Sequence, residues 1–265
     1  VVTVVTADLQ GLTDGSSYTL KANFSDAAGN LATANTEISF TVDTTAPTIT
    51  SVSSTTTDGS YKEGTAIEVT VNFSETVTLI GGDLEVTLET GSTDRTVTLT
   101  SISGATSATG TYTVQSGDTS DDLTVSGVAL TAGALSDASG NEMTNFSVGT
   151  NLAVSSDLIV DTMAPTIVLL GNAVETVLVT DTYVDAGTSV SDLLDGTVTV
   201  TTSDSVPVGS PGTYVIYYSA MDAAGNIATP IMRTVIVKDT TVSGDLPFTA
   251  VNFGEDANRK AKWRH

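Results

Sequence analysis

The chain has 265 residues, of which 40% are hydrophobic and only 5% aromatic, and its formal net charge at pH 7 is −22. Such an acidic chain repels phosphate backbones, which argues against a nucleic-acid partner, and the absence of cysteine excludes disulfides and thiolate chemistry. Val, Ile and Thr are abundant and no segment shows a sustained helical period, so the sequence predicts an all-β protein.

Residues 1–43 are predicted to form the C-terminal part of a truncated β module. Residues 18–24 alternate in polarity as a strand does, and residues 36–42 form a second strand-like run after a turn. So few strands cannot bury both faces of a sandwich. We therefore expect the missing strands to come from upstream sequence in a longer parent protein or from another chain.

Residues 44–161 carry the fullest strand pattern. Residues 67–73 (Ile-Glu-Val-Thr-Val-Asn-Phe) alternate apolar and polar side chains, and turns rich in Gly and Asp separate the shorter runs that follow. These further strands are predicted at residues 84–88, 95–101, 111–115, 123–125 and 158–160. Many short alternating strands at this spacing predict a Greek-key β-sandwich.

Residues 162–239 predict a second, shorter sandwich, with strands at residues 167–170, 197–201, 214–218 and 232–237. Residues 240–265 differ in character and are predicted to be a tail of unassigned structure with a basic end. Its last seven positions hold four of the nine basic residues of the chain: Arg259, Lys260, Lys262 and Arg264.

One turn sequence, Asp-x-x-Gly-Asn, occurs three times at intervals of domain size, which indicates modules in series. The copies begin at Asp26, Asp137 and Asp222. Each is followed by a Thr- or Val-rich run and then by a linker, and the first two linkers contain Asp43 and Asp161. Gly and Asn accept positive φ, and Asp accepts hydrogen bonds from neighbouring amides, so a hairpin turn alone accounts for the motif.

The chain resembles the tandem bacterial Ig-like repeats of very large surface adhesins and related exported proteins. The linker at residues 42–47 (Val-Asp-Thr-Thr-Ala-Pro) and the Asp-x-x-Gly-Asn turns match the joints of those repeats, and residues 67–75 match one subtype of module. Residues 183–187 (Tyr-Val-Asp-Ala-Gly) and 211–214 (Pro-Gly-Thr-Tyr) match a second subtype. The resemblance implies tandem Ig-like Greek-key β-sandwiches in an elongated array, located outside the cell or on its surface.

A second interpretation of the repeated turns is a metal site at each joint between modules. In an Ig sandwich the loop between the last two strands lies at the end where the chain enters, so each turn should lie near the preceding linker. This brings Asp137 and Asn141 near Asp43 at the first joint, and Asp222 and Asn226 near Asp161 at the second. The loop after the second strand reaches the same end, which adds Glu75 as a candidate at the first joint and Asp192 and Asp195 at the second. Such oxygen donors suit Ca²⁺, which takes about six to eight of them, and the resemblance also implies calcium at the joints.

Catalysis is not expected. The single histidine, His265, stands at the end of the sequence, so no histidine-based triad can form, and aromatic residues are too scarce for the sugar-stacking cleft of a glycosidase. The sequence and the resemblance instead predict a structural or adhesive extracellular spacer, a rod-like segment of a secreted cell-surface adhesin or filament. Its expected partners are neighbouring Ig-like modules of the same or another chain, without insertion into a membrane.

Two alternative functions stay open. The first is a glycan- or protein-binding module formed by residues 162–239, for which the candidate contacts on a host or surface partner are Tyr183, Tyr214, Tyr217 and Tyr218. The second is a subunit of a filament assembled by strand complementation, in which residues 1–43 of one copy pair with residues 248–253 of another.

Overall fold

The computed structural model describes residues 11–22, 24–31, 36–203, 205–207 and 209–239. The predicted basic tail and the candidate strand at residues 248–253 lie outside this part. The described chain is built of strands and one four-residue helix, α2 (Leu152–Ser155), which confirms the all-β prediction. None of its helices is long and apolar enough to cross a membrane.

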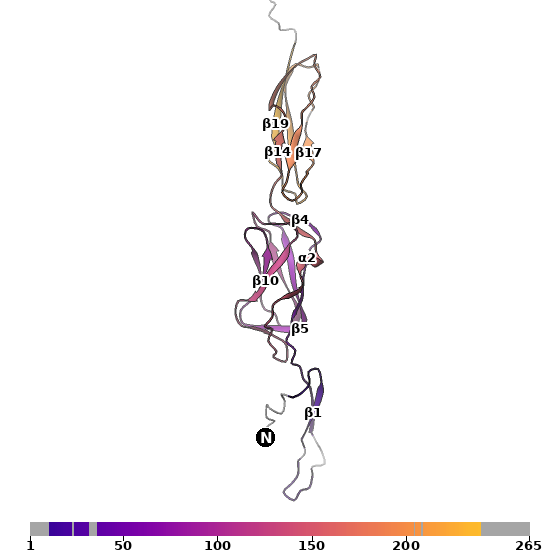
Figure 1. The fold of residues 1–265 in the computed structure, drawn as a ribbon, viewed down its shortest axis with the longest axis vertical. Coiled ribbons are helices and arrows are strands. Elements are labelled where there is room, and N and C mark those ends of the chain that lie inside the picture. The colour runs from indigo at the N-terminus through magenta and orange to yellow at the C-terminus, as the bar shows by residue number, and fades with distance from the viewer. Residues whose placement is uncertain (1–10, 23, 32–35, 204, 208, 240–265) are drawn as a thin grey trace, which may run out of the picture. The chain divides into compact units, whose positions relative to one another are not determined.

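The first element is an antiparallel hairpin of β1 (Ser17–Ala22) and β2 (Thr36–Thr41) (Figure 1). Its register places Tyr18 opposite Phe40 and Leu20 opposite Ile38, so one face of the hairpin is apolar. Among the described strands, β1 and β2 pair only with each other. The segment predicted to complement this hairpin, residues 248–253 of another copy, lies outside the described residues, so strand complementation stays a prediction.

A larger sandwich follows the hairpin. One of its sheets has the order β10-β6-β7, and another has the order β11-β5-β3-β12, with β8 also paired to β5. A short third sheet has the order β4-β13-β9. The strands are β3 (Ile49–Ser53), β4 (Gly59–Tyr61), β5 (Ala66–Ile80), β6 (Leu84–Glu89), β7 (Arg95–Leu99), β8 (Ala105–Thr113), β9 (Thr119–Ser120), β10 (Thr124–Leu130), β11 (Ala134–Ser136), β12 (Val148–Thr150) and β13 (Leu158–Asp161).

The long strand β5 shows why this sandwich forms. Ile67, Val69, Val71 and Phe73 are buried, and the residues between them are not, so the side chains alternate between core and solvent. Facing residues of β6 and β7 are buried in the same hydrophobic core. The predicted strand at residues 67–73 is confirmed, but β5 continues beyond it to Ile80.

A buried polar network fixes the turn between β8 and β9. The carboxylate of Asp118 is 1% exposed and accepts hydrogen bonds from Arg95 Nε (2.8 Å) and the Tyr112 hydroxyl (2.6 Å). Burial raises the pKa of Asp118, but the bonds from Arg95 and Tyr112 outweigh it and leave the pKa below its ordinary value. Thr162 donates its hydroxyl to the carbonyl of Asp118, which holds the chain after β13 against this turn.

A second sandwich consists of two sheets. The smaller sheet pairs β14 with β16, and the larger has the order β15-β19-β18-β17. Val235 and Val237 of β19 and Ile216 and Tyr218 of β18 bury their side chains between these sheets. The strands are β14 (Thr166–Leu169), β15 (Val174–Leu178), β16 (Thr188–Ser191), β17 (Val200–Thr202), β18 (Gly212–Ala220) and β19 (Ile231–Lys238).

The chain divides into two compact units. Of the described residues, the first comprises those up to residue 165 with residues 192–198 and 221–227, and the second comprises residues 166–191, 199–220 and 228–239. The loops between β16 and β17 and between β18 and β19 thus belong to the first unit. The predicted module boundaries at residues 43, 161 and 239 stay a prediction.

Candidate cation site

The three Asp-x-x-Gly-Asn turns close on their own hydrogen bonds. Asp26 Oδ1 accepts from the backbone N–H groups of Ala28 (2.9 Å) and Asn30 (2.8 Å), and its Oδ2 accepts from Asn30 Nδ2 (2.8 Å). Asp137 repeats all three bonds, and Asp222 repeats the two from its turn asparagine. The glycine of each turn has a φ that favours glycine: 91° at Gly29, 90° at Gly140 and 87° at Gly225. The turn geometry therefore needs no ion.

The asparagine of two turns also holds the preceding linker. Asn141 Nδ2 donates to the carbonyl of Asp43 (3.1 Å), and Asn226 Nδ2 donates to the carbonyl of Asp161 (3.0 Å). The proximity of turn and linker predicted from the sequence is thus present at both places. The sequence predicts Asn141 and Asn226 as oxygen ligands, but in the structure their amide nitrogens donate hydrogen bonds to the linker. The recurrence of Asn after Gly in each turn could have indicated this role.

We call the first acidic group the Asp43 cluster: Asp43, Glu75 and Asp137, whose carboxylates place one oxygen each within 4.8 Å of one another. Protein donors already engage two of its members. Asp43 Oδ1 accepts from Thr45 N–H (3.1 Å) and its Oδ2 from the Ser139 hydroxyl (3.3 Å), and both oxygens of Asp137 accept within its turn. Burial raises the pKa of Asp137, but the bonds from Asn141 outweigh it and lower the pKa.

We call the second group the Asp161 cluster: Asp161, Asp192 and Asp222, again with one oxygen each within 4.8 Å of one another. Asp161 is fully buried, its Oδ1 accepts from Met163 N–H (2.9 Å), and its Oδ2 has no partner among the described residues. Asp192 Oδ1 accepts from the backbone N–H groups of Leu194 and Asp195, but its buried Oδ2 also has no partner there. This cluster thus holds two buried carboxylate oxygens without a donor.

No side chain of the described residues forms an ion pair that neutralises the negative charge of the Asp161 cluster. Burial raises the pKa of Asp161, and the charges of Asp192, Asp222 and Asp195 raise it further, against one lowering hydrogen bond from Met163. None of the ion pairs within the described residues involves the cluster. Buried carboxylates without a partner are costly, so the arrangement favours a bound cation.

Asp195 lies beside the turn of Asp222, as predicted, but its carboxylate is not one of the three in the cluster. Its Oδ2 accepts from Ala223 N–H, so it braces the turn of Asp222 and lies outside the group of three. Lys62 Nζ donates to the carbonyl of Gly225 (3.2 Å) in the same turn. Six of the nine predicted ligands therefore form the two clusters, and the other three residues support the loops around them.

The donor set of the Asp161 cluster fits a hard divalent cation. Three carboxylates offer only oxygen, the ligand that Ca²⁺ prefers, and the two unpartnered oxygens are free to bind it. The Asp43 cluster fits less well because protein donors already bind the oxygens of Asp43 and Asp137. No unpartnered buried oxygen is found there among the described residues.

The four tyrosines of the second sandwich do not form an exposed patch. Tyr217 is 50% exposed, whereas Tyr218 is 1% exposed, and Tyr183 and Tyr214 are half-buried. A binding face built on adjacent tyrosines is therefore not present in this unit.

These features define a protein of tandem β-sandwiches whose linkers are tied to acidic turns. Within it, residues 167–237 match the family described as Bacterial surface protein, Ig-like domain, so the second sandwich is similar to modules of bacterial surface proteins. No curated protein sequence matches the chain significantly. A solved structure of Clostridium thermocellum CbhA fibronectin(III)-like modules is 14% identical, with 72% of this chain and 96% of that chain covered. Its TM-score is 0.26, which is too low to establish a common fold.

Proposed function

We propose that the chain is a spacer segment of a bacterial surface protein and that a Ca²⁺ ion bound by the Asp161 cluster orders the segment between its two sandwiches. The family match supports a surface module, and that family is one of Ig-like domains without a catalytic role. The observation that carries the calcium proposal is the pair of buried, unpartnered oxygens, Asp161 Oδ2 and Asp192 Oδ2.

Each residue of the cluster has a separate part in this proposal. Asp161 ends β13 and contributes a carboxylate from the linker, while Asp192 and Asp222 contribute carboxylates from the loops after β16 and β18. The ion supplies positive charge where burial and the neighbouring carboxylates disfavour the ionised form of Asp161. Asn226 keeps the linker in place through its bond to the Asp161 carbonyl.

The consequence for a spacer is mechanical. The two loops lead directly into strands of the second unit, and the linker from Asp161 enters its first strand at Thr166. An ion shared by the linker and both loops restricts the conformations open to residues 162–165. We therefore expect calcium to stabilise the folded protein and to narrow its distribution of sizes in solution.

The test compares melting curves and small-angle scattering profiles in calcium and in chelator. Calcium should raise the melting temperature of the wild type and narrow the distribution of molecular dimensions derived from its scattering profile. Neither change should occur in Asp192→Asn. Asp157→Asn removes one charge from an exposed aspartate and is the matched control, which should respond as the wild type does. Curves that chelator leaves unchanged in the wild type would remove the proposal.

A further inference from the structure

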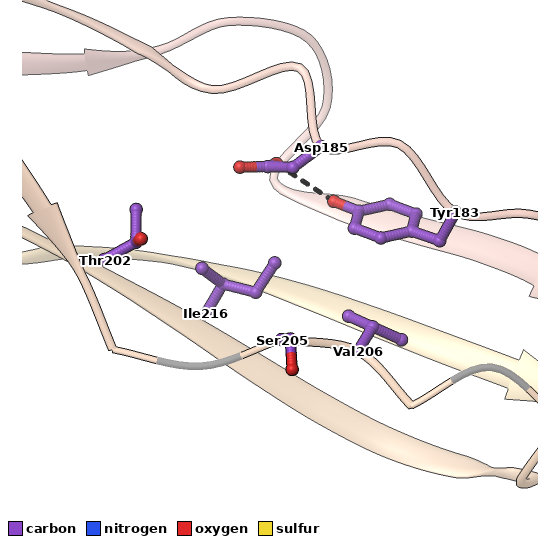
Figure 2. Close-up of a pocket in the computed structure, with 6 residues that line it drawn as sticks. All are labelled: Tyr183, Asp185, Thr202, Ser205, Val206 and Ile216. Carbon is purple, nitrogen blue, oxygen red and sulfur yellow. Dashed lines mark hydrogen bonds between the residues drawn. The ribbon is translucent and has the colours of Figure 1, made fainter.

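The second unit contains a cavity of about 280 Å³ beside the segment that joins β17 to β18. Figure 2 shows Tyr183 and Asp185 on one side of it, with Ile216 and Val206 opposite them. The lining residues are Tyr183, Asp185, Thr202, Ser205, Val206 and Ile216. None of them belongs to the acidic clusters described above, so this cavity is a separate feature of the molecule.

A fixed carboxylate forms the polar side of the cavity. Asp185 accepts hydrogen bonds from the hydroxyls of Tyr183 (3.0 Å) and Tyr218 (2.8 Å) and forms an ion pair with Arg233 Nη1. Burial raises the pKa of Asp185, but the bonds from Tyr218 and Tyr183 outweigh it, so the group stays ionised. Its side chain is 28% exposed, which leaves it accessible to a ligand.

The buried Arg233 neutralises the charge of the Asp185 carboxylate. The arginine is 1% exposed and lies directly across from Ile216 in the β18–β19 register. Its Nη2 donates to the carbonyls of Leu170 and Gly187, while its Nε is a buried donor without a partner among the described residues. The charges of Asp185 and Arg233 cancel, so the cavity has polar groups but little net charge.

The other wall of the cavity is mostly apolar. Ile216, which is 4% exposed, and Val206 contribute aliphatic side chains to the lining, and Tyr183 contributes an aromatic ring. Thr202 also lines the cavity, and the Ser205 hydroxyl points away from Asp185 and Tyr183 in Figure 2. A ligand here would meet hydrogen-bonding groups on one side and C–H groups on the other.

We propose that this cavity binds one neutral sugar unit of a glycan. A pyranose ring has hydroxyls around its edge and apolar C–H faces, which matches a fixed carboxylate opposite aliphatic and aromatic side chains. The volume lies just below the range of about 300–1,000 Å³ typical of sites for drug-sized ligands, so it suits a single ring. The cancelled charge gives no attraction for a simple anion or a metal cation.

The probe is a set of neutral monosaccharides (glucose, galactose, mannose and N-acetylglucosamine), tested one at a time by saturation-transfer NMR on the whole chain. Val206→Trp is designed to fill the cavity with an indole ring while Asp185 and Arg233 are kept unsubstituted. Val184→Trp makes the same change at a neighbouring side chain that is 80% exposed and does not line the cavity. Circular dichroism establishes that both variants fold.

We expect saturation transfer to at least one sugar in the wild type and in Val184→Trp, and a loss of most of that signal in Val206→Trp. Absence of transfer to all four sugars overturns the proposal, as does transfer that Val206→Trp leaves intact. Because the cavity shares no residue with the Asp161 cluster, the result is independent of whether calcium binds there. Repeating the measurement in chelator should leave the sugar signals unchanged.

Discussion

The Asp43 and Asp161 clusters are built from the same turn motif but differ in how their oxygens are satisfied. In the Asp43 cluster, backbone and side-chain donors of Thr45, Ser139 and Asn141 bind the carboxylates of Asp43 and Asp137. In the Asp161 cluster, Asp161 Oδ2 and Asp192 Oδ2 are buried without a donor among the described residues. Proximity of carboxylates is therefore common to both clusters, whereas buried carboxylate oxygens without a donor among the described residues occur only in the second.

The structural cause of the difference is the third carboxylate. Asp192 comes from a tight loop in which its Oδ1 caps two backbone N–H groups, and this leaves its Oδ2 facing a buried environment. Glu75 instead lies within the long strand β5 and is half-buried, and neither of its carboxylate oxygens is a buried atom without a partner among the described residues. Burial of Asp161 beside two further carboxylates is unfavourable without a counter-charge, because unsolvated carboxylates repel one another strongly.

The largest expected effect is the loss of calcium stabilisation in Asp161→Asn. At a calcium concentration of about 100 times Kd, the wild type should gain about 2.7 kcal/mol in free energy of unfolding, and the variant should gain almost none. In chelator the variant should be more stable than the wild type, because it lacks a buried unpaired charge. Denaturant titrations with and without calcium measure both differences. Equal calcium responses of the two proteins would break the contrast between the clusters.

The next largest effect is a difference in stability between variants of the two turn aspartates, Asp137 and Asp222, when calcium is absent. Asp137→Ala removes three hydrogen bonds from a satisfied carboxylate and should lower the free energy of unfolding by about 2 kcal/mol. Asp222→Ala should cost less, because it also relieves repulsion with Asp161. Urea unfolding of both variants in chelator tests this order, and a larger cost for Asp222→Ala would contradict it.

A smaller effect concerns the asparagines that hold the linkers. Asn141→Ala removes a bond to one linker carbonyl and Asn226→Ala removes bonds to two, and each variant also loses the bond to its turn aspartate. Each should cost about 1 kcal/mol or somewhat more in chelator. Only Asn226→Ala should also weaken calcium binding, because it releases the backbone of Asp161. Calcium titrations of the two variants give the comparison. A weakened calcium response in Asn141→Ala alone would reverse the assignment.

The smallest effect is a pH dependence at Glu75. Burial raises the pKa of Glu75 above its ordinary value of 4.5, and the charges of Asp137, Asp43 and Asp14 raise it further. The folded state therefore keeps this proton at pH values where the unfolded chain has lost it, so stability falls as the pH rises through that interval. Glu75→Gln should remove the fall, changing the free energy of unfolding by about 0.5 kcal/mol or less. Unfolding curves in chelator, recorded below and above the interval, test the sign.

Much of the fold could be predicted from the sequence because its strands alternate in polarity. The runs at residues 84–88 and 232–237 reappear within β6 and β19 with boundaries shifted by one residue. The short strands β4, β9 and β12 were not predicted, since two or three residues carry no readable period and their pairing depends on the rest of the sandwich.

For the site, the sequence predicted which residues lie close together but not the hydrogen bonds that they form. The topology of an Ig sandwich placed Asp161 near Asp222, and the structure has them together. The hydrogen bonds that distinguish the clusters could not be predicted, because they depend on the backbone conformation of each loop residue. The same limit hid the role of Asp195, whose side chain caps Ala223 instead of joining the cluster.

The most direct test of the central claim is a count of bound calcium ions by isothermal titration calorimetry. We predict one saturable site in the wild type, which disappears in Asp192→Asn and persists in Glu75→Gln. Two equivalent sites, or one site that Glu75→Gln abolishes and Asp192→Asn leaves intact, would contradict it.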